Sequence, residues 1–295
     1  MKSRRDVIQA LSGLAVLPML PRLAEAATRP ADDDLSQVTA TAEKFFSDLG
    51  YTKNPPKSLL TGDTFNGGVC FDETLEFDPP GKWFAIQPCS RVEDYNRGSE
   101  DCVLAYFHIL SLYNSENKTF DNLLRQCFSF LFGPCKLDPA RLVIVSTNRF
   151  QPYLETAKSY GIKDTHFVQR NFAEAKAQGD GSGYFNPKGL PYIDGGCLTA
   201  SFNYLMKPDA PLTESTYPVK DSLELGELGV TDDPQANINP QSAGLGLERI
   251  MTAMGTTAPS FEQTRKLGLA AMSDEAKQSD KPLPSAYQQL TRKTT

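Results

Sequence analysis

Apolar residues recur every three to four positions in two parts of the chain, which is the pattern of amphipathic helices. The first series begins after Asp34 and consists of Leu35, Val38, Ala42, Phe45, Phe46 and Leu49. Gly50 follows it as a residue that commonly ends helices, so we predict a helix from Asp34 to Leu49. The second is the run "FDNLLRQCFSFLF", with Thr119 as its cap and Gly133 at its end, which predicts another helix.

Other stretches predict strands, and most of them are rich in β-branched and aromatic residues. They cover residues 82 to 89, 103 to 113, 141 to 147 and 222 to 230. We also predict a short helix over residues 152 to 161, a glycine-rich loop over 179 to 196 and a polar connector over 231 to 242. Because hairpin-like loops rather than regular strand–helix units join the strands, the chain predicts an α+β fold, with a mostly antiparallel β-sheet flanked by helices.

The first 26 residues, "MKSRRDVIQALSGLAVLPMLPRLAEA", have the character of an export signal. A basic segment precedes an apolar run over residues 7 to 20, and Ala24 and Ala26 form an A-x-A cleavage site. Arg4 and Arg5 match the twin-arginine signal, so we expect the export machinery to deliver the protein to the periplasm or beyond. The run is too short, and too broken by prolines, for a stable membrane anchor. The alternative is an amphipathic first helix of a cytosolic protein.

The rest of the chain suits one large domain. Hydrophobic residues make up 40% and charged residues 22% of the 295 residues, as in ordinary globular proteins. The formal net charge is −6, and loss of the leader makes it about −8. Nucleic-acid binding requires a basic surface, so this charge argues against a large RNA-binding surface. We expect a linker over residues 27 to 33, a core over 34 to 255, and a polar C-terminal tail over 256 to 295 that forms no further domain.

The cysteines have two interpretations. There are six, namely Cys70, Cys89, Cys102, Cys127, Cys135 and Cys197. In an oxidising compartment an even number permits up to three disulfides, although the spacing does not fix their pairing. Their alternative role is that of small buried hydrophobic residues. With two histidines in the chain and no C-x-x-C pair, the sequence argues against a zinc site.

The stretch "AGLGLERIMTAMG", residues 243 to 255, combines glycines with an arginine at the start of a predicted helix. Gly244 and Gly246 would let the backbone approach a ligand closely, and the amides of a helix N-terminus favour negative charge. Arg249 would add a charge-assisted contact to such an anion. The alternative is a glycine-rich start of a packed helix, with Arg249 exposed to solvent.

An arginine and an aromatic pair lie upstream. "RVE" follows the strand "KWFAIQPC", and Tyr106-Phe107 lies on the expected return strand. Followed by "GLGLERI", this order resembles the second and third signature motifs of class II aminoacyl-tRNA synthetases, and most of all their alanyl-type core. "FFSDLGYTKNPPKSLL", "QPCSR" and "LDPARLVIVST" also resemble segments of that core. The resemblance runs from about Asp34 to Gly255 and implies a class II catalytic core over these residues.

The resemblance implies an ATP site. Arg91 would hold the α-phosphate, where fixed guanidinium groups can stabilise the charge that builds up when a carboxylate attacks. Tyr106 or Phe107 would stack on adenine, and Arg249 would cover its other side and reach the terminal phosphate. The implied nucleotide-binding residues are Arg91, Glu93, Tyr106, Phe107, Gly244, Gly246 and Arg249.

The resemblance also implies sites for magnesium and for the substrate. A carboxylate on the strand before the third motif usually holds Mg²⁺, which points to Glu224 and Glu227; the alternative is a polar strand edge. Asp194 is a candidate for holding a substrate ammonium group. Ser242 stands where alanyl enzymes carry the aspartate that anchors alanine, and His108 stands in place of a glutamate. Both departures argue against alanine as the substrate.

Three functions fit these features. The first is an exported, stand-alone synthetase-like ligase that activates an amino or carboxylic acid as an adenylate for transfer to a non-tRNA acceptor. The second is a catalytically inactive extracytoplasmic protein that holds a small ligand in the same pocket. The third, a full tRNA ligase, is disfavoured by the acidic charge and by the space of about forty residues after Gly255. The sequence favours the first function and leaves a homodimer open.

Overall fold

The computed structural model describes residues 31–61, 64–65, 81–91, 94–96, 104–116, 120–185, 196–207, 219, 221–231 and 241–292. The expected leader and most of the linker lie outside these ranges, as do Glu93, Asp194, Cys70 and Cys102. Export, and the roles assigned to these four residues, therefore stay predictions.

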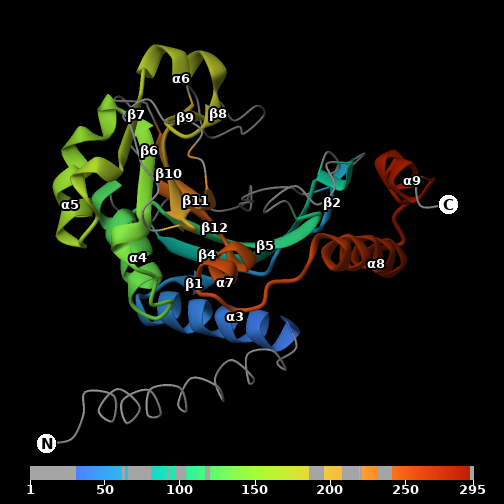
Figure 1. Cartoon of the computed structure of the whole chain (residues 1–295). Coiled ribbons are helices and arrows are strands. Elements are labelled where there is room, and N and C mark those ends of the chain that lie inside the picture. The colour runs from blue at the N-terminus through green and yellow to red at the C-terminus, as the bar shows by residue number, and fades with distance from the viewer. Residues whose placement is uncertain are drawn as a thin grey trace, which may run out of the picture.

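Most of the described strands form one ten-stranded sheet in the order β1-β4-β5-β12-β11-β10-β6-β7, with β8 and β9 joined beside β10 (Figure 1). The pairs at its two edges, β1–β4 and β6–β7, are parallel, and the pairs between them are antiparallel. The strands are β1 (Thr52–Lys53), β4 (Lys82–Ser90), β5 (Tyr106–Asn114), β6 (Leu142–Thr147), β7 (Phe167–Arg170), β8 (Asp180–Gly181), β9 (Tyr184–Phe185), β10 (Cys197–Leu205), β11 (Ser222–Thr231) and β12 (Gln241–Gly246), with a separate pair formed by β2 (Leu60–Thr61) and β3 (Thr64–Phe65).

Helices flank this sheet (Figure 1). They are α3 (Ala31–Asp48), α4 (Phe120–Phe132), α5 (Leu154–Ser159), α6 (Phe172–Gln178), α7 (Leu247–Ala253), α8 (Phe261–Ser279) and α9 (Ser285–Arg292). The predicted α+β class, with a mostly antiparallel sheet flanked by helices, is confirmed. None of the described helices combines the length and the apolar character that a membrane span requires.

The main hydrophobic core lies between the sheet and the helices α3, α4 and α7. Alternate residues of a strand point to opposite faces, so each central strand sends every second side chain into this core. Leu110 and Leu112 of β5 and Leu245 of β12 are fully buried there, in one cluster with Phe46 of α3 and Phe128 of α4. Burial of this apolar surface is the main source of stability for the sheet.

The segment expected to be a polar tail contains two helices, α8 and α9. Ser260 and Gln263 form a capping box at the start of α8, and the helix packs on β5 and β2. Glu275 of α8 accepts hydrogen bonds from the backbone N–H groups of Leu59 and Leu60, at 3.0 and 3.4 Å. A second, smaller core results, consisting of Leu59, Leu60, Tyr95, Ala105, Phe261, Met272, Ala276 and Leu290.

Five further elements, β7, α6, β10, β12 and α5, differ from the expectation. β7 and α6 occupy a stretch to which no element was assigned, and β10 follows directly after the expected glycine-rich loop. β12 covers residues that we expected in the polar connector and at the start of the last helix. The helix expected over 152 to 161 is reduced to α5, because a 3-10 helix, η3 (Asn148–Tyr153), contains Pro152 and precedes it.

The described cysteines are buried. Cys127 and Cys135 are free thiols, and burial raises the pKa of both, to about 12 for Cys135. Cys89 and Cys197 are 0% and 7% exposed. These positions match the role of small buried hydrophobic residues, whereas the disulfide expected after export stays a prediction for the chain as a whole.

Candidate functional site at one end of the sheet

The two motif regions lie side by side in the sheet. β5 pairs with β4 on one side and with β12 on the other, and β12 runs directly into α7 with Gly246 as the N-cap. In antiparallel strands, the end of one lies beside the start of the next. The end of β4, the start of β5 and the start of α7 are therefore brought together at one end of the sheet (Figure 1).

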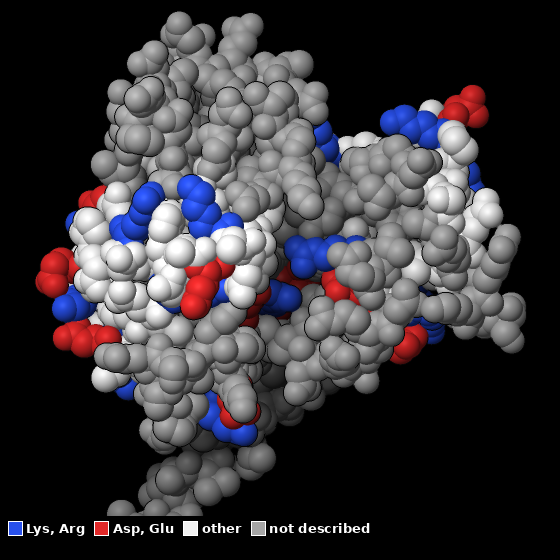
Figure 2. All heavy atoms as spheres, turned by 90° about the horizontal axis from the view of Figure 1, so that it is seen from above, with Lys and Arg blue, Asp and Glu red and all other residues white. Residues whose placement is uncertain are grey.

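The sheet has a second face, opposite α3, α4 and α7, which we call the polar face. Cross-strand partners point to the same face, and the register connects Ser201, Glu227, Gly244, Ser111 and Ala85 in one row across β10, β11, β12, β5 and β4. Seen from above, basic and acidic side chains gather around a hollow near the middle of the molecule (Figure 2). Apart from Glu227, the residues of this row have small side chains, and Ser201, Ser111 and Ala85 are buried.

The structure separates the two aromatic candidates for adenine stacking. Phe107 lies four residues before Ser111 in β5 and so points to the polar face. The Arg91 guanidinium lies 5.1 Å from the centre of the Phe107 ring. Tyr106 points the other way, towards α8, where a side chain at Gly268 would meet it. Phe107, rather than Tyr106, therefore shares the region with Arg91.

Arg249 reaches the same end of the sheet from α7. Its Nη1 donates a hydrogen bond to the backbone oxygen of Glu224 at 2.9 Å and lies 3.6 Å from the Glu224 carboxylate. The side chains are 33% and 48% exposed, so the ion pair is open to solvent. Such pairs are worth about 0–1 kcal/mol. Loss of the ion pair would therefore cost little, and a phosphate would also have to replace the hydrogen bond to the Glu224 backbone oxygen.

A β-bulge brings both candidate magnesium ligands to the polar face. Glu224 and Glu227 are three residues apart and would lie on opposite faces of a regular strand. Glu224 pairs with Asn203, and Gly226 pairs with the preceding Phe202, so that one residue of β11 is left over between them. The bulge changes the alternation of side chains, and Glu224 and Glu227 point to the same side.

Glu227 already has a structural contact. Its Oε1 accepts a hydrogen bond from the backbone N–H of Ser182 at 2.5 Å. Ser182 has a left-handed backbone, with φ of 52°, in the turn between β8 and β9. Arg170 donates to the backbone oxygens of Gly181 and Ser182 at 3.0 and 3.1 Å. Glu227 therefore helps to hold this turn, whereas Glu224 lies nearer to Arg249.

The remaining motif residues line β12. Gly244 lies opposite Glu227, and Ser242, two residues earlier, is half-buried on the same face. Gly246 has an ordinary φ of −75°, and a Cβ there would be 3.6 Å from the nearest atom, in the Arg249 side chain. The protein's own packing thus leaves room for an alanine at Gly246, which fits a glycine that is needed for a ligand.

Ser111 has an unsatisfied hydroxyl. It is 2% exposed, and among the described residues its Oγ has no hydrogen-bond partner. Its cross-strand neighbours Gly244 and Ala85 offer no polar side chain. A buried polar group without a partner costs about 1–3 kcal/mol. A ligand that lies on the row could supply the missing hydrogen bond.

Sequence reasoning missed the role of Glu248. This residue is 2% exposed, and its carboxylate accepts hydrogen bonds from the backbone N–H of His108 at 2.9 and 3.1 Å. The His108 Nδ1 lies 2.8 Å from Oε1 of the same carboxylate. Burial, and to a smaller degree the Glu248 charge, raise the pKa of Tyr106 to about 12. The sequence "ER" alone does not indicate whether Glu248 or Arg249 is buried.

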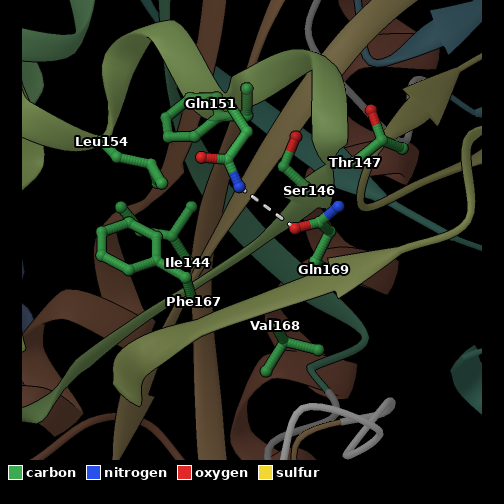
Figure 3. Close-up of a pocket in the computed structure, with 9 residues that line it drawn as sticks. Ile144, Ser146, Thr147, Gln151, Leu154, Phe167, Val168 and Gln169 are labelled. Carbon is green, nitrogen blue, oxygen red and sulfur yellow. Dashed lines mark hydrogen bonds between the residues drawn. The ribbon is translucent and has the colours of Figure 1, made fainter. Parts of the chain in front are cut away.

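A small pocket lies elsewhere, between the ends of β6 and β7 and the helices η3 and α5 (Figure 3). Its volume is about 20 Å³, and Gln151 donates across it to Gln169 at 3.2 Å. This is room for about one water molecule. The pocket is too small for a substrate.

Glu224 and Glu227 of β11 are the candidate ligands for Mg²⁺. Within the described ranges, no group of three or more histidine, cysteine, aspartate or glutamate residues could hold a metal ion. Mg²⁺ that accompanies phosphates needs one or two protein carboxylates, because phosphate oxygens and waters supply its other ligands. Glu224 fits that limited requirement better than Glu227, which is occupied by the turn.

No family model matches the sequence, and no curated protein matches it. Among solved structures, the chain is similar to the aspartyl tRNA synthetase from Entamoeba histolytica, at 11% sequence identity and a TM-score of 0.39. The similarity covers 79% of this chain and 57% of that one. The chain thus spans little more than half the length of that protein.

Proposed function

We propose that this chain is a stand-alone class II synthetase-like protein that binds an adenine nucleotide where β4, β5 and β12 meet α7. One observation carries the proposal. Arg91, Phe107 and Arg249 come from segments far apart in the sequence, and the adjacent strands β4, β5 and β12 bring them to one end of the sheet. A cation beside an aromatic ring, with a second cation at the same end of the sheet, suits a base that carries phosphates.

Each residue has a role that its position supports. Phe107 offers a ring for stacking on adenine, and Arg91 beside it offers positive charge to the α-phosphate. Arg249 would exchange its weak contact with Glu224 for the terminal phosphate, which frees the Glu224 carboxylate for Mg²⁺. Mg²⁺ would neutralise phosphate charge there. Gly246 lets the ligand approach the backbone.

The row from Glu227 to Ala85 is the proposed floor for the acid that is activated. Its carboxylate oxygen attacks the α-phosphorus of ATP, the bond from that phosphorus to the bridging oxygen breaks, and pyrophosphate leaves. The acyl group then passes from the resulting adenylate to an acceptor other than tRNA, the bond from the acyl carbon to the phosphate oxygen breaks, and AMP leaves. Ser111 offers a hydrogen bond to the acid, and Arg91 stabilises the charge on the phosphorus. The acid is an amino or carboxylic acid.

A catalytically inactive binding protein on the same fold is the second candidate. Two observations favour it: the contact of Glu227 with the turn at Ser182, which occupies one of two candidate metal ligands, and Ser242 in place of an aspartate. Exchange of labelled pyrophosphate into ATP, with single amino and carboxylic acids added, separates the two candidates. Exchange with any acid supports the ligase, whereas nucleotide binding without exchange supports the binding protein.

Calorimetric titration with ATP and Mg²⁺ tests the nucleotide site. Arg249→Ala should weaken binding about ten- to a hundred-fold, the value of a lost charge-assisted contact. The matched control is Arg125→Ala on α4, an arginine paired with Asp121 on the far side of the core, which should bind ATP normally. No affinity for ATP or AMP in the unmutated protein would refute the proposal.

We also propose export by the twin-arginine route, on the basis of Arg4, Arg5 and the small residues at 24 and 26. Replacement of both arginines by lysine should leave uncleaved precursor in the cytoplasm. Normal processing of that variant would contradict export. Because the chain is acidic, the mature protein should not attach alanine to total tRNA, which an aminoacylation assay can check.

A further inference from the structure

Within the part of the chain that the structure describes, the buried carboxylate of Glu248 forms its hydrogen bonds with one residue, His108 of β5. It lies in the first turn of α7 and contacts both the backbone N–H and the ring Nδ1 of His108. A carboxylate that loses its water must be hydrogen-bonded, or its burial is very unfavourable. The contact is therefore specific, and it ties the start of α7 to the start of β5.

This contact begins where the strand pairing stops. The last paired residues of β12 and β5 are Gly246 and Ile109, and beyond them β12 becomes α7. His108, the next residue outward on β5, donates its backbone N–H to the Glu248 side chain instead of to a strand. Glu248 thus continues the connection between the two segments past the end of the ladder.

The two residues in contact are sequence neighbours of two of the proposed nucleotide-binding residues, Phe107 and Arg249. Glu248 directly precedes Arg249, and His108 directly follows Phe107. We propose that Glu248 is a positioning residue that sets the distance between Phe107 and Arg249, the space in which the adenine base is held. This inference rests on the proposed nucleotide site and adds a residue to which the resemblance assigned no role.

His108 is held from its other side as well. The Tyr106 ring lies edge-on to the imidazole, with 5.2 Å between ring centres and 80° between ring planes. Tyr106 in turn packs against α8 at Gly268, where an added Cβ would be 2.8 Å from the Tyr106 Cβ. Because His108 also packs against Tyr106, its contact with Glu248 adds a side-chain link between α7 and β5 to the pairing of β12 with β5.

A double-mutant cycle tests this role, with calorimetric titration of ATP and Mg²⁺ into the unmutated protein, Glu248→Gln, Phe107→Ala and the double variant. Glu248→Gln keeps the side-chain size and one acceptor oxygen, and should weaken ATP binding about ten-fold. In the Phe107→Ala background it should have little further effect, because the residue that it positions is already gone. Glu262→Gln, an exposed glutamate in the first turn of α8, is the matched control and should bind ATP normally.

The outcomes separate this inference from the proposed function. Equal fold losses in both backgrounds would overturn the positioning role and leave the nucleotide site standing. Absence of ATP binding by the unmutated protein would overturn both. If Glu248→Gln does not fold, His108→Gln replaces it in the cycle, because it removes the ring contact and keeps the backbone N–H. The same non-additivity with Phe107→Ala is then expected, and additive losses would overturn the inference.

Discussion

Neighbouring residues of β5 point to opposite faces of the sheet and have very different surroundings. Leu110 and Leu112 belong to the large apolar cluster with α3, α4 and α7, while Ser111 between them points to the polar face. All three are almost completely buried, at 0%, 0% and 2% exposed. The difference lies in what each side chain contacts: the leucines are fully packed, and the Ser111 hydroxyl has no partner among the described residues. One face is built for stability, and the other leaves an interaction open.

The largest expected effect is a difference in the free energy of unfolding between a variant on the core face of β5 and one on its polar face. Leu110→Ala should lower the free energy of unfolding by about 2–5 kcal/mol, because it leaves a cavity in the core. Ser111→Ala should leave it unchanged or raise it by up to about 1–3 kcal/mol, because it removes a buried hydroxyl that has no hydrogen bond to lose. Urea denaturation of the two variants measures both values. Equal losses would mean that the polar face is part of the same core.

Substitution of two glycines by alanine should have effects of intermediate size on stability. Gly226, at the bulge, has φ of +157°, and a Cβ there would be 2.0 Å from the backbone oxygen of Gly244. Gly226→Ala should therefore cost about 1–3 kcal/mol of strain. Gly246→Ala should alter stability by less than about 0.5 kcal/mol. It should nevertheless weaken ATP binding, because the added methyl group lies next to Arg249 on the ligand side.

Thermal unfolding and ATP titration of both variants check this pair. Normal ATP affinity of Gly246→Ala would show that no ligand approaches the backbone at this position. A stable Gly226→Ala would show that β11 can lose its bulge, in which case Glu224 and Glu227 need not share a face.

The adjacent aromatic residues Tyr106 and Phe107 point to opposite faces, so their variants should differ in ATP binding. Phe107→Ala should weaken ATP binding about ten-fold, because stacking of a base on an aromatic ring is worth about 1–3 kcal/mol. Tyr106→Phe, which keeps the ring that packs against α8, should bind ATP as the unmutated protein does. Calorimetry distinguishes the two. The reverse order of effects would move the adenine to the other side of β5.

Some elements of the fold can be predicted from the sequence, and others cannot. The strands over 82 to 89 and 222 to 230 and the helix from Asp34 have strong local patterns, and they are present. β12 reads "QSAGLG" and contains no β-branched residue, so its strand state depends on its pairing with β5 and β11 on either side. No local pattern contains that information.

The helix α8 and the bulge in β11 were not predicted from the sequence, for different reasons. The capping box Ser260–Gln263 was present in the sequence and could have indicated α8, but its apolar residues are too sparse for a clear helical period. The bulge at Gly226 had no such signal. It brings Glu224 and Glu227 to one face although their spacing of three predicts opposite faces. Likewise, only the fold shows that Glu248 is buried and Arg249 exposed.

A last comparison concerns the pH dependence of stability. The pKa of Tyr106 lies at about 12 in the folded protein against an ordinary value of 10.0, mainly because of burial. Between pH 10 and pH 12 the unfolded chain therefore releases this proton and the folded protein retains it, so stability falls as pH rises. In Tyr106→Phe the fall should be less steep, although it should persist because burial also raises the pKa of Tyr51 and Tyr95. Urea denaturation across this window checks the slope, and identical slopes would contradict the burial of the phenol.

The most direct measurement of the central claim is hydrogen–deuterium exchange of the protein with and without ATP and Mg²⁺. The account predicts that ATP slows exchange in the segments 82–91, 104–114 and 241–253, which carry Arg91, Phe107 and Arg249. It also predicts no change in α4 and α5, which pack on the opposite face. Protection confined to α4 and α5, or none in the three segments at saturating ATP, would contradict a nucleotide site at this end of the sheet.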